Sequence, residues 1–246
     1  MRLVARIRRP NITSTFDFAI CVLPFVLSLI AGSTDVIGFL SLNGLFTAHI
    51  TGNLVVLAAR VVAGDRTVLS YLLSVPVFML VLFLTSLFAS GLRRFGVSTL
   101  RPLLLLQLIF IVAFFMLCVI AGPWRDANAT LAIVAGMLGV AAMAAQNALV
   151  QISLKQSPTT AVMTTNVTHF FLDLSRLLID RDLDEVAKAR NRASHNLPVI
   201  VGFTIGLVLG AFCEAAAGLW SLALPAGLAL LAFAMSFVAP TSRDCG

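Results

Sequence analysis

The sequence has few charged residues: Asp, Glu, Lys and Arg make up 11% of its 246 residues, while apolar residues make up 59%. A soluble domain has roughly one-quarter charged residues, and one soluble core cannot bury so large an apolar fraction. The composition therefore predicts an integral membrane protein. It also excludes the fibrous, disordered and disulfide-rich secreted classes.

Motifs for chemistry are also missing. The chain has no GxxxxGK[ST] loop, no HExxH motif and no GxSxG motif. Its three histidines are widely separated, and its four cysteines lack metal-binding spacing. We therefore expect neither a metal nor a cofactor. The net charge of +6 comes mostly from Arg residues between apolar runs, which is the positive-inside pattern and not a nucleic-acid-binding face.

Long apolar runs are what the chain does have, and they predict an all-α polytopic membrane bundle in a single domain, residues 1–246. The six expected spans are Phe18–Leu42, Val68–Leu92, Pro102–Ala121, Ala129–Leu154, Leu197–Ala217 and Leu219–Val238. The basic N-terminus also resembles a signal peptide, but the length of the first run favours a retained helix with a cytoplasmic N-terminus. The charged segment 180–196 is expected to be a solvated cytoplasmic helix.

Two further segments, Leu45–Gly64 and Thr160–Ile179, are long enough to span but more polar. They belong to an internal repeat of approximately 18–121 and 129–238, because Thr51-Gly52-Asn53 recurs as Thr164-Thr165-Asn166, 113 positions later. If both segments span, eight helices make the halves parallel. If neither spans, six helices make the halves inverted. The distribution of Lys and Arg does not decide between these two topologies.

Asp35 is the first candidate site residue, because a carboxylate within a membrane helix is costly unless it is paired or functional. The small residues Ala31-Gly32-Ser33-Thr34 before it suggest an unwound turn. Asp35 is interpreted either as a proton, cation or solute site or as an interfacial group paired with a loop arginine such as Arg66. Both interpretations stay open.

The polar segments supply the other candidates. His49 and Asn53 are expected on one helical face beside Thr51, either lining a site or bonding helices together. In the second half, Asn166 is the counterpart of Asn53, and Asn147 corresponds to Thr34. One helical face there carries Thr165, His169, Asp173, Arg176 and Asp180, with His169–Asp173 and Asp173–Arg176 as expected pairs. That helix either lines an aqueous cavity, with His169 as a proton relay, or lies at the inner membrane surface.

Ala31-Gly32, Asp35, Gly38-Phe39-Leu40 and the segment Phe46 to Asn53 resemble the signature of the YoaK family of bacterial polytopic membrane proteins. The second half is similar through Gln146-Asn147-Ala148 and Met163 to Asn166, although Thr165 stands where the family pattern often has Gly. The resemblance implies a bacterial inner-membrane protein and brings no established substrate or catalytic residue.

These features favour an ion-coupled secondary transporter or permease for a small solute, with a site at the repeat interface. The candidate site residues are Asp35, His49, Thr51, Asn53, Asn147, Asn166 and His169. The alternatives are a non-transporting scaffold or ligand sensor and, less favoured, an intramembrane enzyme. The expected partners are membrane lipids, the solute and a second copy in a homodimer, with both termini cytoplasmic.

Overall fold

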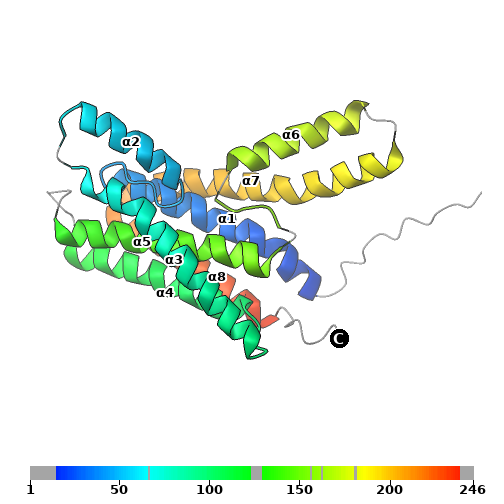
Figure 1. The fold of residues 1–246 in the computed structure, drawn as a ribbon, viewed down its shortest axis with the longest axis horizontal. Coiled ribbons are helices and arrows are strands. Elements are labelled where there is room, and N and C mark those ends of the chain that lie inside the picture. Colours follow the sequence, from blue (N-terminus) through cyan, green and yellow to red (C-terminus); the bar gives the residue numbers. More distant parts are fainter. Residues whose placement is uncertain are drawn as a thin grey trace, which may run out of the picture.

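The computed structural model describes residues 15–65, 67–122, 129–155, 157–161, 163–179 and 182–238. This part of the chain is helical and contains no strand, so the predicted all-α class is confirmed. The expectations for Arg66 and for the two chain termini fall outside the described residues. The elements are α1 Thr15–Ser41, α2 Ile50–Val62, α3 Leu69–Arg94, α4 Leu100–Ala121, α5 Thr130–Ser153, α6 Met163–Ile179, α7 Leu183–Ala217, the 3-10 helix η1 Gly218–Leu222 and α8 Ala223–Val238 (Figure 1).

Five stretches of the described chain are long and apolar enough to cross a membrane, which makes this a multi-pass membrane protein. They are Val22–Ser41, Leu69–Arg94, Leu100–Ala121, Thr130–Ser153 and Leu183–Phe237. The last stretch contains both α7 and α8, and the chain reverses direction between them at η1 (Figure 1).

One expectation about the first helix is wrong. It is not unwound before Asp35, because α1 is continuous and the hydroxyls of Ser33 and Thr34 donate to carbonyls of its preceding turn. This bonding satisfies the hydroxyls without breaking the helix. The charged segment 180–196 is helical from Leu183 onwards, and α7 continues from it without a break through Pro198 to Ala217.

The two polar segments are shorter helices than their sequences suggest. The α2 helix has 13 residues, about 20 Å of helix, which is too short for a hydrocarbon core of about 30 Å. Non-helical residues 42–49 precede α2, and a similar connection precedes α6. Figure 1 shows that α2 and α6 both begin near the middle of the molecule and run towards opposite ends.

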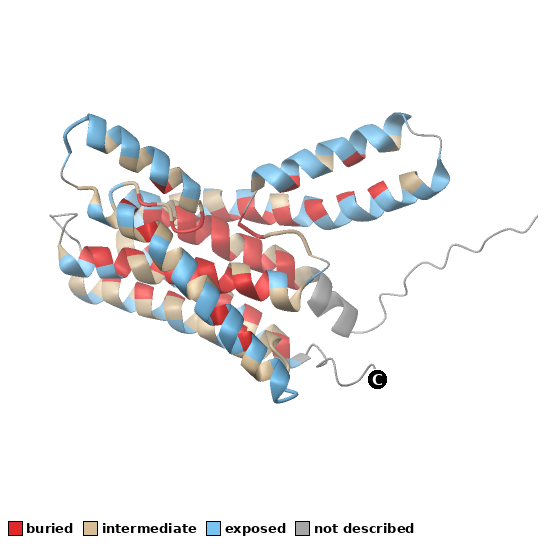
Figure 2. Ribbon diagram, in the orientation of Figure 1, coloured by how far each residue is buried: buried red, intermediate tan, exposed pale blue. Residues whose placement is uncertain are grey.

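The long helices pack in a crossed pattern. Helix α1 packs against α7 and α8, while α5 packs against α3 and α4, and α2 and α6 lie on α3 and α7 respectively. Buried residues are concentrated in α1 and α5 (Figure 2). Backbones of α1 and α7 touch at glycines: a methyl group on Gly206 would overlap the carbonyl oxygen of Leu29. Such small-residue contacts are the usual basis of close helix packing in membranes.

Glycines also make room for the connection between α1 and α2. The chain turns back at Asn43 and Gly44, which both have positive φ. It then passes between α1 and α5, where Thr47 is fully buried. A methyl group on Gly139 of α5 would lie 2.9 Å from the Thr47 methyl group, so only glycine leaves space for this segment.

Candidate functional site

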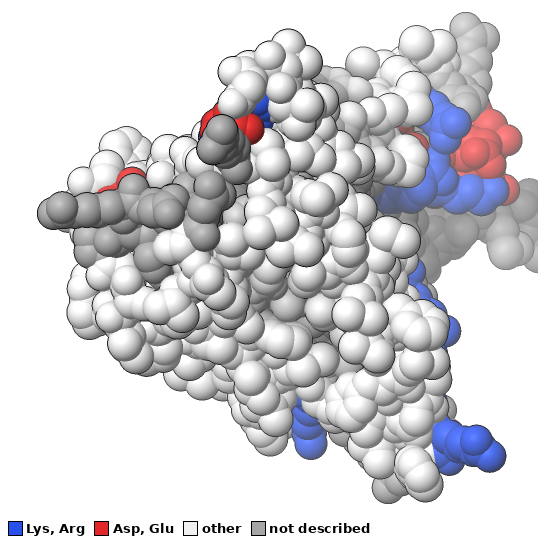
Figure 3. Space-filling view, turned by 60° about the vertical axis from the view of Figure 1, so that its left-hand side comes forward, with Lys and Arg blue, Asp and Glu red and all other residues white. Residues whose placement is uncertain are grey.

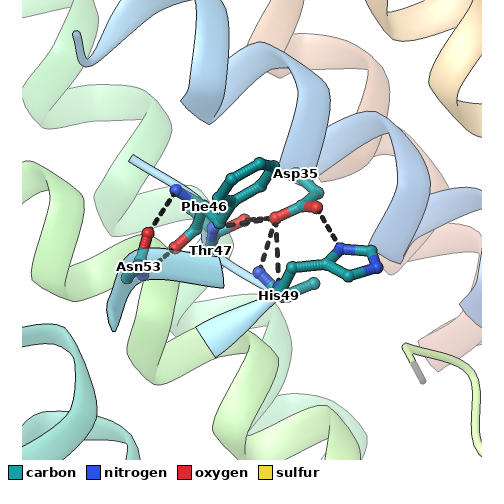
Figure 4. A network of polar contacts seen from close by, with 6 residues as sticks. Asp35, Phe46, Thr47, His49 and Asn53 are labelled. Atoms are coloured by element: carbon teal, nitrogen blue, oxygen red, sulfur yellow. Dashed lines mark hydrogen bonds and ion pairs between the residues drawn. The ribbon is translucent and has the colours of Figure 1, made fainter. Parts of the chain in front are cut away.

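Asp35 of α1 binds the backbone just before α2. Its Oδ1 atom accepts hydrogen bonds from the backbone N–H groups of Thr47 at 2.8 Å and Ala48 at 2.7 Å, as Figure 4 shows. The residue is 2% exposed. Both N–H groups precede the helix and its N-cap, His49, and buried backbone N–H groups need an acceptor. Asp35 therefore holds the connection that leads into the short helix from a neighbouring element.

The other carboxylate oxygen of Asp35 holds His49. The Nδ1 atom of His49 lies 2.6 Å from Oδ2 of Asp35 (Figure 4). An ionised carboxylate only accepts hydrogen bonds, so Nδ1 carries the proton and donates it, which leaves Nε2 to interact elsewhere. The His49 side chain is 40% exposed, and its ring makes edge contacts with Phe46 and Phe203. The pair can stabilise an imidazolium, which suits proton exchange at His49.

Asn53 of α2 and Asn166 of α6 make a similar contact. Asn53 clamps the residue seven positions before it, because its Nδ2 donates to the Phe46 carbonyl at 2.8 Å and its Oδ1 accepts from the Phe46 N–H at 2.9 Å. Asn166 Nδ2 likewise donates to the carbonyl of Thr159 at 2.6 Å. Each asparagine thus joins the first turn of a short helix to the connection that precedes it.

At the connection before α6, side-chain amides have the role that the Asp35 carboxylate has before α2. Gln146 of α5 donates through Nε2 to the Thr160 hydroxyl and to the Leu27 carbonyl of α1, both at 2.8 Å. Its Oε1 accepts from Gln107 of α4 at 2.6 Å. Thr160 lies 113 positions after Thr47, and both residues are fully buried. The connection before α6 is therefore anchored by neutral hydrogen bonds, while the one before α2 is anchored by a charge.

Asp173 of α6 is buried against α7 and not exposed in an aqueous cavity. It pairs with Arg192, whose Nη2 lies 2.6 Å from Oδ1, and more loosely with Arg176 at 3.6 Å. The sequence predicted an Asp173–Arg176 pair but missed Arg192. Within the described structure, His169 is exposed and forms no hydrogen bond or ion pair with Asp173. The chemistry available on this face is an ion pair that ties the two helices together.

A second cluster of polar residues lies where α2 ends and the chain continues to α3. Arg60 of α2 donates to Asp65 and to Thr67, each at 2.7 Å, and to the carbonyl of Asn43. Its guanidinium lies 5.0 Å from the centre of the Tyr71 ring, and the Tyr71 hydroxyl also donates to the Asn43 carbonyl. The Thr67 backbone N–H, and then Arg60, hold the pKa of the Asp65 carboxyl below its ordinary value.

The predicted site residues divide into two groups. Asp35, His49 and Asn53 come together around the start of α2, although His49 precedes the helix and does not share a helical face with Asn53. Asn166 occupies the equivalent place in α6. Thr51 and His169 are exposed, and Asn147 donates only to the Met143 carbonyl of its own helix. Within the described residues, no group of three His, Cys, Asp or Glu side chains could hold a metal ion.

Sequence reasoning missed the backbone N–H groups of Thr47 and Ala48 and the buried Gln107. The amide of Gln107 had a visible signal, because it interrupts the most apolar helix of the chain. A comparison with protein families finds one whose model matches residues 23–235, described as "Protein of unknown function (DUF1275)". No curated protein and no solved structure matches the chain.

Proposed function

Because the chain belongs to the DUF1275 family, which has no assigned activity, we propose a function from the geometry: a secondary transporter or permease for a small solute. The observation that carries this proposal is the pair of short helices, α2 and α6, that begin near the middle of the bundle and run to opposite ends (Figure 1). Interrupted helices near the membrane midplane are typical of transporter binding sites, where helix ends and freed backbone groups contact solutes and ions.

We propose that six helices cross the membrane and that the two halves are inverted. The packing supports this proposal, because exchanging α1–α4 with α5–α8 reproduces it: α1 on α7 becomes α5 on α3, and α1 on α8 becomes α5 on α4. The two asparagine clamps, on Phe46 and Thr159, obey the same 113-residue offset as the sequence repeat. Inverted halves allow alternating access by rocking around a central site.

The charge distribution supports a cytoplasmic position for the end at which α1 begins. Apart from Arg60, the Lys and Arg residues of the described chain lie at the end of α3, the start of α4, just after α5, in the last turn of α6 and in the first part of α7. These residues are Arg93, Arg94, Arg101, Lys155, Arg176, Lys188, Arg190 and Arg192. Figure 1 draws these helix ends on the side where α1 begins, and Figure 3 shows the broad uncharged surface between charged margins. By the positive-inside rule, an inner-membrane location would put this end of the protein in the cytoplasm.

In this mechanism, Asp35 and His49 couple transport to protons. Asp35 fixes the tautomer of His49 and stabilises its protonated form, and the side chain of His49 is 40% exposed, which leaves it accessible to a solute. Asn53 and Asn166 act as positioning residues, because their side chains are committed to the chain itself. Membrane lipids and a second copy in a homodimer stay as predictions about partners.

Topology gives the first test. We expect a cysteine at Asp65 to react with a membrane-impermeant maleimide on intact cells, and a cysteine at Arg94 to react only after permeabilisation. Both would be placed in a background without the four native cysteines. The opposite pattern would mean that α2 and its connection span the membrane, which would make the halves parallel and end the inverted model.

Two-sided access gives the second test and needs no known solute. A cysteine in place of His49 should be labelled by a small impermeant thiol reagent in both right-side-out and inside-out vesicles, because a transporter opens its centre to each side in turn. A cysteine in place of Ala142, which is fully buried in α5, is the matched control and should react from neither side. Labelling of residue 49 from one side only would favour the scaffold or sensor alternative.

A further inference from the structure

A pocket of about 510 Å³ opens beside the first part of α7. Its volume lies within the range of pockets that hold small molecules. It is lined by Ser157, Pro158, Asn191, Arg192, His195 and Asn196. The pocket lies at the end of the molecule where the basic residues gather, and its floor includes the connection that leads into α6.

Arg192 gives the pocket a cationic hydrogen-bond donor. It uses Nε and Nη2 to bind Asp173, and its Nη1 takes no part in that pair. His195 donates through Nδ1 to the carbonyl of Asn191 at 2.6 Å, so Nε2 of the neutral ring is an acceptor. No carboxylate is among the described residues that line the pocket.

Asn196 brings a side-chain amide to the pocket. The residue is 6% exposed, and no hydrogen bond joins its amide to the described part of the chain. The amide atoms themselves are not fully buried, so they can bind water or the polar groups of a ligand. Because Asn196 lines the pocket, its amide is available to a molecule bound there.

The charge around the pocket favours an anion. Arg192 and Arg176 share one counter-ion, Asp173, so the two cations exceed the anion by one charge in this cluster. The guanidinium of Arg192 is a planar set of donors that matches carboxylate and phosphate oxygens. The charge of Arg192 would repel a cationic solute, and an apolar solute would leave the amide of Asn196 unpaired.

Side chains occupy the matching place in the first half of the chain. Ser157 corresponds to Gly44 by the 113-residue offset, and the Tyr71 hydroxyl and the Arg60 guanidinium lie within 4 Å of a methyl group placed there. Asn196 corresponds to Ser74 by the offset of the helical prolines Pro76 and Pro198, and the Ser74 hydroxyl is satisfied by the Tyr71 carbonyl. The first half is therefore filled where the second half is open.

We propose that this pocket binds a small solute through a carboxylate or phosphate group and is its entry site on the basic side of the protein. The statement that the ligand then crosses the membrane rests on the proposed function, while binding of the oxyanion does not. Its three contributions are separate: Arg192 supplies the charge, Asn196 the side-chain amide, and Ser157 a hydroxyl at the mouth.

Binding to the full-length protein in detergent tests the proposal. Inorganic phosphate and succinate, each titrated against chloride at equal ionic strength, should raise the melting temperature saturably. Arg192→Gln should weaken the binding at least tenfold. Arg190→Gln removes an equal charge two residues away, at a position outside the pocket, and should leave binding unchanged. Asn196→Leu keeps the charge and the side-chain size, and it should also weaken binding if Arg192→Gln proves hard to fold.

The outcomes separate the possibilities. Absence of saturable binding, or equal loss in Arg190→Gln, would overturn the pocket as an anion site. An Arg192-dependent shift with phosphatidylglycerol nanodiscs and none with free phosphate or succinate would assign the pocket to a lipid headgroup and overturn the solute. Binding without flux of the same anion in proteoliposomes would leave the pocket standing and contradict the transporter proposal. Flux without binding would contradict the pocket as an anion site and leave the transporter proposal standing.

Discussion

Gly206→Ala should destabilise the protein by about 3 kcal/mol, because the added methyl group overlaps backbone atoms of α1 that cannot move aside as a side chain could. For a chain of this size, that cost corresponds to a fall in melting temperature of about 6 to 12 °C. The measurement is thermal unfolding of the purified protein in detergent. The helices α1 and α7 lie together along their length, so the substitution separates the pair that carries Asp35 and Phe203.

Gly91→Ala is the matched control. Gly91 also lies in a membrane helix, α3, but a methyl group there meets nothing within 4 Å. Alanine is preferred over glycine in helices by about 1 kcal/mol, so this variant should be unchanged or slightly more stable. A similar loss of stability in both variants would mean that glycine matters for the helix itself, and not for the contact between α1 and α7.

Asp35→Ala should be the most damaging change at the site. It leaves the N–H groups of Thr47 and Ala48 buried without an acceptor, at an expected cost of about 4 kcal/mol for the two donors together. The protein should express poorly or melt far below the parent. Asp65→Asn is the control for losing a carboxylate, because Asp65 is exposed in the connection between α2 and α3.

Asp35→Asn should separate stability from function. Its Oδ1 can still accept from Thr47 and Ala48, so the fold should survive. Its amide nitrogen replaces the oxygen that accepts from His49, which favours the opposite tautomer of the ring. We expect this variant to lose the proton uptake that small organic acids drive, measured with a pH-sensitive dye inside proteoliposomes. Normal proton uptake by a folded Asp35→Asn protein would remove Asp35 from the coupling mechanism and leave it only as an anchor for the connection before α2.

The apolar helices could be predicted from the sequence because lipid imposes a simple requirement on length and hydropathy. Helix α4, for example, was expected from Pro102 and begins at Leu100. The connection before α2 could not be found this way. Leu45 to His49 are compatible with a helix, but they are non-helical in the structure, where a carboxylate from another helix binds the N–H groups of Thr47 and Ala48. That interaction depends on tertiary structure.

The candidate site shows the same division. Asp35, His49 and Asn53 were identified because polar residues are conspicuous in a lipid-facing chain, and the structure brings them together. The Asp173–Arg192 pair was missed because its members lie on separate helices whose packing no local pattern reveals. The unpaired amide of Asn196 was missed for a related reason: whether an asparagine has a partner depends on the neighbours that the fold supplies.

The crossed packing of the long helices has a consequence for synthesis. Helix α1 is synthesised long before its main neighbours, α7 and α8, which come after the other helices in the chain. Until then, the polar connection that Asp35 anchors lacks α5 on its other side, so the first half must wait in the bilayer with an incomplete interior. Neither half can reach its final form alone, and the protein should assemble late and all at once after the second half has been inserted.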